Sequence, residues 1–224
     1  MSSTSPLSDF DEQQAMMMAE RCIMVDEQDN VLGPVSKYDA HRGSGILHRA
    51  FSVLLFDSSD RLLLQQRSHE KITFPGVWAN SCCSHPLHVD AELEEAGQAG
   101  VMHAALRKIQ QELGIDPGSF EGCEFRHLGR MHYQARANAE WVEHEMDHVL
   151  AVRADVDTDH NTNEIADVAW VDPSALQGMC EDPAFEMAPW FLAIKSLFLD
   201  AGWPSGSDSF PPTLDNIQHM GVLT

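Results

Sequence analysis

The sequence predicts a single α/β (α+β) domain in which a mixed β-sheet is sandwiched by helices. Its 224 residues and 43% hydrophobic content suit one sizeable core, because single domains commonly reach this size. Strand-like runs come first, one long helical pattern follows, and further strands precede C-terminal helices. That order favours a mixed sheet covered by helices over a regular βαβ repeat.

The first half of the chain predicts two hairpins, over residues 20–37 and 47–67. Each segment gives an apolar run, a polar turn and a second strand-like run. A Phe-Pro-Gly-Val-Trp segment at 74–78 predicts a loop that leads into a short strand near residues 80–84. We therefore expect an N-terminal hairpin ahead of the central strands.

Residues 91–113 predict the main helix, because their apolar side chains mostly follow helical spacing. Gly114 stands where a helix C-cap is expected. Gly97 and Gly100 weaken the first half, so regular helix is expected from about Val101.

The second half of the chain predicts three strands, over residues 120–136, 141–156 and 167–171. Pro173 and Pro189 each suit the first turn of a C-terminal helix, because that turn needs no backbone donor.

Three segments are expected: a disordered acidic leader over residues 1–19, one domain over 20–202, and a tail over 203–224 that forms a wrap or a loose end. The leader has neither the basic start nor the apolar run of a signal peptide. No stretch approaches the ~18 consecutive apolar residues that span a bilayer. We therefore expect a cytoplasmic protein with no membrane partner.

The composition excludes one class of partner and leaves the source open. A net charge of −21 argues against nucleic acid, which needs clustered Lys and Arg. An acidic, lysine-poor surface suits either a salt-adapted protein or a merely acidic cytosolic one. The five cysteines are odd in number and two are adjacent, so a reduced compartment is the simpler assumption.

Cys83 and His85 lie two apart in the expected short strand, so they face one cavity, with Cys82 and Ser84 opposite. A thiol beside an imidazole suits a nucleophile with its base, a metal site, or an acid beside a metal ligand. A small buried cysteine explains the pattern equally well when it is taken alone.

Glu143 and Glu145 share one strand face, with His144 and Met146 on the other. Paired carboxylates repel unless a cation or a shared proton relieves them. Exposure to solvent is the alternative, although apolar neighbours such as Trp141 make a fully solvated strand less favoured.

His41 and His48 flank a glycine-rich loop, so their imidazoles can converge despite the seven-residue gap. Together with His85 and the two glutamates they offer three nitrogens and two oxygens. That set suits a five- or six-coordinate Zn²⁺, Mn²⁺ or similar ion.

Residues 107–115 resemble the end of the Nudix motif, which gathers Mg²⁺ on a diphosphate with a glutamate cluster. Glu112 matches that pattern, but Lys108 and Gln111 stand where two further acids belong. These departures put pyrophosphate hydrolysis in doubt while leaving the fold plausible.

Over roughly residues 20–200 the chain resembles type I isopentenyl-diphosphate isomerases, which have a Nudix-like fold. The matching segments are 37–41, 48–52, 74–86, 112–114, 143–145 and 188–190, together with Tyr133. The resemblance implies a Nudix-like catalytic domain that interconverts isopentenyl diphosphate and dimethylallyl diphosphate in isoprenoid biosynthesis. We expect it to act as a monomer.

The resemblance also implies the roles of individual residues. One Mn²⁺ or Zn²⁺ (or Mg²⁺) would be held by His41, His48, His85, Glu143 and Glu145, and Glu112 would bind the Mg²⁺ that arrives with the diphosphate. Substrate contacts would come from Lys37, Arg67, Lys71, Ser84, Lys108 and Trp190.

The implied chemistry is protonation of an alkene to a tertiary carbocation, followed by loss of a proton from the neighbouring carbon. Cys83 and Glu145 would act from opposite sides, with Tyr133 near the glutamate and the Trp190 ring facing the cation. The resemblance does not set which of the two groups protonates in each direction.

Three other interpretations stay open. The runner-up is a Nudix-type pyrophosphohydrolase, which release of phosphate or pyrophosphate would favour. A non-enzymatic metal- or diphosphate-binding protein would not need Cys83 together with Glu145. A thiol protease or acyl transferase using Cys83 and His85 is weaker, because no third orienting group is evident.

Overall fold

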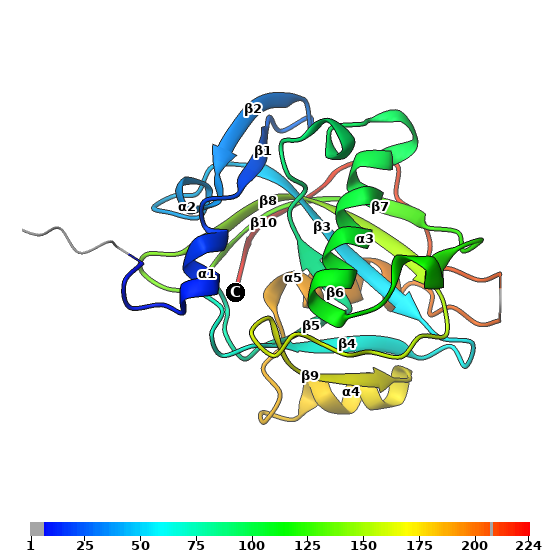
Figure 1. Ribbon diagram of the computed structural model, residues 1–224. Helices are drawn as coiled ribbons and strands as arrows, with labels where there is room; N and C mark the ends of the chain where they lie inside the picture. The colour runs from blue at the N-terminus through cyan, green and yellow to red at the C-terminus, as the bar shows by residue number, and fades with distance from the viewer. Residues whose placement is uncertain (1–6, 207) are drawn as a thin grey trace, which may run out of the picture.

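The computed structural model describes residues 7–206 and 208–224 of the chain (Figure 1). The helices are α1 (Glu12–Met17), α2 (Lys37–Ala40), α3 (Ala99–Leu113), α4 (Pro173–Glu181) and α5 (Pro189–Ile194), which continues into a π-helical turn at Lys195–Leu199. The strands are β1 (Arg21–Val25), β2 (Val31–Ser36), β3 (His48–Phe56), β4 (Leu62–Arg67), β5 (Trp78–Asn80), β6 (Cys82–Ser84), β7 (Arg126–Arg136), β8 (Val142–Arg153), β9 (Ile165–Val171) and β10 (Gln218–Leu223).

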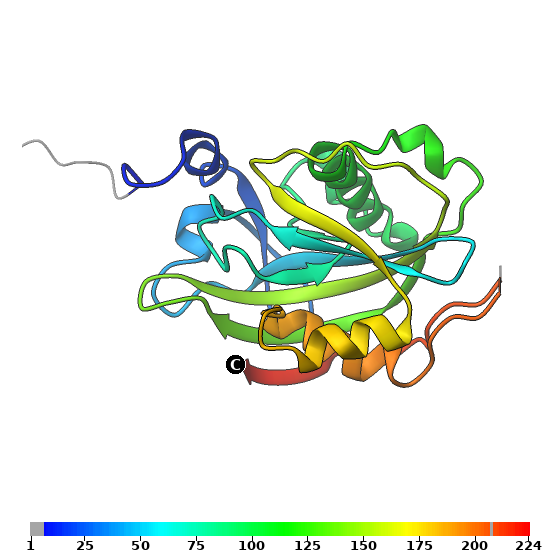
Figure 2. The same cartoon turned by 90° about the horizontal axis from the view of Figure 1, so that it is seen from below.

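The strands form a mixed sheet in the order β10-β7-β8-β3-β1-β2, with β4, β5, β6 and β9 joined through β3 and β4. β3 and β8 pair in parallel, and every residue of β3 is buried. α3 covers one face of the sheet, and α4 and α5 cover the other (Figures 1 and 2). The prediction of a mixed sheet sandwiched by helices is confirmed.

Alternation along β3 divides the interior into two cores. Leu54 and Phe56 pack toward α4 and α5, whereas Val53 and Leu55 pack toward α3. Because both faces of β3 are covered, its sequence is apolar without interruption.

The helix predicted over residues 91–113 is regular only in its second part, close to the start expected at about Val101. α3 begins at Ala99, and the preceding residues form two short 3₁₀ turns, where Gly97 has φ of 59°. The predicted C-cap is confirmed, since Gly114 has φ of 69°. A Cβ there would lie 2.2 Å from the carbonyl oxygen of Asp159, so only glycine fits this approach.

The prediction of a disordered leader is wrong for residues 7–19, and residues 1–6 lie outside the described part of the chain. Asp11 caps α1 by accepting hydrogen bonds from the amides of Gln13 and Gln14. The side-chain amide of Gln14 donates through Nε2 to the backbone and side-chain oxygens of Asn163, at 3.1 and 2.9 Å. A short helix that finds a distant partner is stabilised by that contact, which local sequence does not reveal.

The tail is also part of the sheet, as a wrap with a strand at its end. β10 pairs in parallel with β7, and the amide of Leu214 donates to the carbonyl of Leu128 at 2.6 Å. The folded unit therefore extends beyond the expected 20–202 boundaries on both sides. None of the helices in the described ranges is long and apolar enough to cross a bilayer.

Candidate active site

A pocket lies where α1, α2, the end of β4, β6, β7, β8 and α5 meet. Its lining includes these residues that the sequence singled out: Lys37, Arg67, Lys71, Cys83, Ser84, His85, Tyr133, Glu143, Glu145 and Trp190. Four other predicted residues, His41, His48, Lys108 and Glu112, are buried behind it. Ser84 was expected to face away from Cys83, but it lies at the end of β6 and reaches the same pocket.

Strand register brings the expected metal ligands together. The parallel pairing of β3 with β8 sets His48 opposite Glu145, and the pairing of β7 with β8 sets Tyr133 opposite the same glutamate. His41 ends α2, and its carbonyl accepts from the amide of Val142 at the start of β8. Among the described residues, ligand atoms of His41, His48, His85 and Glu145 all lie within 4.8 Å of one another.

Gly45 allows the loop between His41 and His48 to close against β8. It has φ of 71°, and a Cβ there would lie 2.9 Å from the Cβ of His144. A larger residue would push the loop away from the strand and separate the two imidazoles.

Backbone carbonyls orient two of these imidazoles. The Nδ1 atoms of His41 and His48 lie 2.8 and 2.7 Å from the carbonyl oxygens of Lys37 and Ile46. If each Nδ1 carries the proton and donates it, each Nε2 lone pair is directed into the cluster. This is the outer support usual for histidine metal ligands.

Burial favours the neutral imidazole form of His48 and His85. Burial and the neighbouring His41 lower the pKa of His48 to about 3, and burial also holds the pKa of His85 well below its usual range. The buried His48 Nε2 has no hydrogen-bond partner. Neutral imidazoles with an orphaned nitrogen beside two carboxylates fit a divalent cation.

The two glutamates titrate in opposite directions. Glu143 Oε2 lies 2.7 Å from His41 Nε2. When that nitrogen carries a proton, the positive charge of His41 outweighs burial and holds the pKa of Glu143 well below its usual range. Burial and the nearby Glu143 carboxylate raise the pKa of Glu145 well above its usual range. A proton or a cation at Glu145 relieves this repulsion.

Cys83 and Glu145 enter the pocket from different strands. Burial raises the pKa of the Cys83 thiol to about 12, although the Arg67 guanidinium, whose Nη1 lies 3.8 Å from Sγ, works against this rise. The Tyr133 hydroxyl donates a hydrogen bond to Glu145 Oε2, and His85 Nε2 lies 2.8 Å from Glu145 Oε1. The pocket thus presents a thiol and an anchored carboxyl group to one space.

Comparison with known proteins decides the family. The NUDIX domain model matches residues 46–191. An isopentenyl-diphosphate delta-isomerase of Gibberella zeae is 44% identical over 93% of this chain and 86% of that protein. Another, of Schizosaccharomyces pombe, is 43% identical over 91% of this chain and 92% of that protein.

The chain belongs to the isopentenyl-diphosphate delta-isomerase family.

Structural comparison shows the Nudix fold of this isomerase-family chain. The solved structure of a Deinococcus radiodurans protein matches it with a TM-score of 0.58 at 19% identity, covering 79% of this chain and 98% of that one. Both the predicted Nudix-like fold and the predicted resemblance to isopentenyl-diphosphate isomerases are confirmed.

The isomerase-family chain holds its predicted cations in different ways. The Arg67 guanidinium donates to the carbonyls of Thr73 and Phe74, at 2.7 and 2.9 Å. Lys37 pairs with Glu20 at 3.8 Å. Arg67, Lys71 and Lys37 line the pocket, whereas Lys108 lies behind it on α3.

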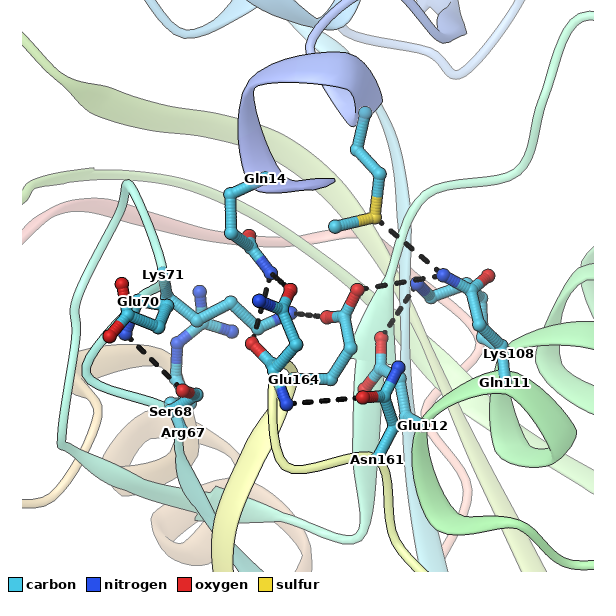
Figure 3. Close-up of polar contacts among 12 residues, drawn as sticks. Gln14, Arg67, Ser68, Glu70, Lys71, Lys108, Gln111, Glu112, Asn161 and Glu164 are labelled. Carbon is cyan, nitrogen blue, oxygen red and sulfur yellow. Dashed lines mark hydrogen bonds and ion pairs between the residues drawn. The ribbon is translucent and has the colours of Figure 1, made fainter. Parts of the chain in front are cut away.

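Figure 3 shows an ion-pair network that includes Lys71, one of the residues that line the pocket. Lys71 pairs with Glu164, and Lys108 Nζ lies 2.9 Å from Glu112 Oε1. Burial favours the neutral acid, but the charges of Lys71 and Lys108 outweigh it and lower the pKa of Glu164 to about 2. Burial lowers the pKa of Lys71, so burial offsets part of the gain from this pair.

Sequence reasoning missed two buried acids in this region. Glu164, 1% exposed, comes from a loop whose acidic composition resembles the rest of the chain, and no local pattern marks it. Asp147, also 1% exposed, accepts from the Ser52 hydroxyl at 2.9 Å, and burial raises its pKa to about 7. Asp147 continues the alternation of Glu143 and Glu145, which was the one signal available for it.

Trp190 lies at the start of α5 with its ring over the pocket. The Arg67 guanidinium carbon stands 5.5 Å from its ring centroid, and Phe74 meets it edge-on at 5.2 Å. These contacts hold the indole in one orientation and leave it among the lining residues.

Proposed function

We propose that the protein interconverts isopentenyl diphosphate and dimethylallyl diphosphate, in isoprenoid biosynthesis, by adding one proton and removing another. The observation that carries the proposal is that Cys83 and Glu145, from different strands, line one pocket that also contains Arg67 and Lys71. Proton donors in a largely dry space and cations for a diphosphate are what this reaction requires.

The acidities of the two groups support this chemistry. Because burial raises the pKa of both Cys83 and Glu145, each holds a proton more firmly than it would in water. One group, in its protonated form, donates its proton to the terminal carbon of the alkene, which leaves a tertiary carbocation. The other group must be ionised, and it accepts a proton from the neighbouring carbon. Proton exchange between the two groups or with water then restores both for the next turnover, so the diphosphate leaves isomerised with no net gain of protons.

Nearby residues stabilise each charged state. When Cys83 has given up its proton, the Arg67 guanidinium at 3.8 Å stabilises the thiolate. The Tyr133 hydroxyl, which donates to Glu145, holds that carboxyl group in position. The Trp190 ring offers its face to the carbocation, an attraction worth about 2 kcal/mol when desolvated.

His41, His48, His85 and Glu145, whose ligand atoms converge, would hold one Mn²⁺, Zn²⁺ or Mg²⁺, with Glu143 beside His41 as the fifth ligand. The orphaned nitrogen of His48 supports this assignment. A bound ion would supply positive charge that orients Glu145 and changes its acidity. We assign a further Mg²⁺, which arrives with the diphosphate, to Glu112.

Hydrolysis of the diphosphate is disfavoured by the same α3 residues. Lys108 occupies a position where the Nudix motif has an acid, and its ammonium binds Glu112 at 2.9 Å. One glutamate beside a lysine suits holding a diphosphate rather than cleaving it. We also propose that the enzyme acts as a cytoplasmic monomer without nucleic acid, and its net charge of −21 supports the last point.

Proton NMR in deuterated water tests the proposal. Isopentenyl diphosphate with the purified protein and Mg²⁺ should give dimethylallyl diphosphate that carries deuterium. C83A should lose this conversion while keeping its fold. An unchanged substrate spectrum, or release of phosphate or pyrophosphate, would contradict it.

A further inference from the structure

A second group of histidines lies on the opposite side of β8 from the pocket. His132 on β7, His144 on β8 and His219 on β10 come from three adjacent strands and line one surface pocket. His144 stands between Glu143 and Glu145 in sequence, so alternation directs it to the other face. His219 is exposed, and the other two are partly buried.

The ring nitrogens of this group are close together. His132 Nε2 lies 3.1 Å from His144 Nε2, and His132 Nδ1 lies 3.2 Å from His219 Nδ1. Register explains the second contact, because β10 pairs in parallel with β7 and sets His219 opposite His132. Figure 1 shows β10 beside these strands.

Each of the two inner imidazoles has an acceptor for a proton on its Nδ1. His144 Nδ1 lies 3.4 Å from the carbonyl oxygen of Gly45, and His132 Nδ1 faces His219. When both Nδ1 atoms donate to these acceptors, the two unprotonated Nε2 atoms lie 3.1 Å apart. Facing lone pairs repel unless a proton or a cation lies between them.

The spacing suits two ligands on one metal ion. Zn–N bonds are about 2.0–2.1 Å long, so two nitrogens at angles of about 90–110° on one ion lie about 2.8–3.4 Å apart. The 3.1 Å separation of the two Nε2 atoms falls inside that range. Imidazole is a preferred ligand of zinc, copper and nickel.

We propose that His132 and His144 form a second metal site, for a borderline divalent transition-metal ion, with His219 as the outer partner that orients His132. Water completes the coordination of this ion. Among the described residues, three or more ligand atoms converge in the His41–His48–His85–Glu145 group, so the outer site offers only its two imidazole ligands. The acidic chain, with a net charge of −21, attracts cations to its surface in general. Binding here fastens β10 to the sheet through His219.

Calorimetry with Zn²⁺ tests the proposal on the full-length protein whose buried site has first been loaded and desalted. The wild-type protein should bind one further Zn²⁺, and H132A and H144A should not. H219A should bind that ion about tenfold more weakly, because loss of an outer-shell partner typically costs 10–100-fold.

H103A is the matched control. His103 is exposed, and its Nδ1 lies 2.8 Å from the carbonyl oxygen of Ala91. Like His144 it contacts a backbone carbonyl through Nδ1, but in the described contacts no second histidine faces it. H103A should bind the further Zn²⁺ as the wild-type protein does. Equal Zn²⁺ binding by wild type and H132A would overturn the proposal.

Two other readouts keep the proposal falsifiable if a variant folds poorly. The electron paramagnetic resonance spectrum of Cu²⁺ added to the loaded wild-type protein should show two coupled nitrogens, and a single nitrogen would contradict the site. Zn²⁺ should also slow amide hydrogen exchange in β10 of the wild-type protein and leave H132A unchanged. Isomerase turnover by H132A should match wild type, which separates this site from the pocket.

Discussion

The two histidine groups lie on opposite sides of β8 and differ in what surrounds them. The inner group, His41, His48 and His85, is buried beside two carboxylates, and His48 Nε2 lacks a hydrogen-bond partner. The outer group, His132, His144 and His219, is open to water and its rings contact one another. Inside the protein a proton or a cation is needed to relieve the repulsion between the two carboxylates, whereas water can solvate the outer histidines.

This difference predicts where substitutions are severe. A buried group without its partner costs several kilocalories per mole, because solvent does not replace the lost contact. An exposed imidazole regains water when its neighbour is removed. Histidine is thus critical beside the buried carboxylates and tolerant on the outer face of the sheet.

The largest expected effect is on turnover. E145Q removes the proposed proton-transfer group and a proposed metal ligand, so kcat should fall at least about 10³-fold, within the range for general acid–base groups. H132A, on the other face, should keep wild-type kcat. The rate of dimethylallyl diphosphate formation, followed by NMR, gives kcat for both variants. Comparable losses in E145Q and H132A would contradict the difference between the two faces.

The next largest effect is expected at Lys108. Its side chain is 2% exposed and pairs with Glu112 at 2.9 Å. K108M leaves that carboxylate buried without its cation, so unfolding free energy should drop by about 3–5 kcal/mol. Urea unfolding measures this loss. R42M breaks the more exposed pair with Glu140 and should cost about 0–1 kcal/mol, so equal losses would contradict the argument from burial.

Acid stability should report on Glu164. Its pKa falls from 4.5 to about 2 on folding, so its contribution is present above pH 4.5 and is lost as pH decreases toward 2. A shift of this size corresponds to at most about 3 kcal/mol. Unfolding free energy of E164Q should therefore depend less on pH between 4.5 and 2 than that of wild type. Parallel pH curves would show that Lys71 does not stabilise the ionised acid.

The smallest effect is expected on the outer face. Without added metal, H132A should lower the unfolding free energy by only about 0.5–1.5 kcal/mol, because its contacts with His144 and His219 are partly exposed and one hydrogen bond contributes about that much net. Thermal unfolding in the presence of a chelator measures it. A larger loss would show that the stacked imidazoles already fasten β10 without an ion.

The sequence identified many pocket residues because strand alternation and short motifs are local. Cys83 with His85, and Glu143 with Glu145, each needed only a two-residue period to be placed on one face. Gly114 marked the end of α3 for an equally local reason, its left-handed φ of 69°. The family resemblance added the proposed substrate-binding roles of the basic residues, which no periodicity indicates.

Long-range pairing decided the rest. Glu164 became important because the loop before β9 sets it against Lys71, which is 93 residues away in sequence. α1 and β10 are ordered by contacts with Asn163 and β7. Because local sequence carries no signal for such distant contacts, both segments resemble loose ends when the sequence is taken alone. Local sequence determined which side chains share a face, and only the tertiary structure decided which charges become buried together, because burial is a property of the packed sheet.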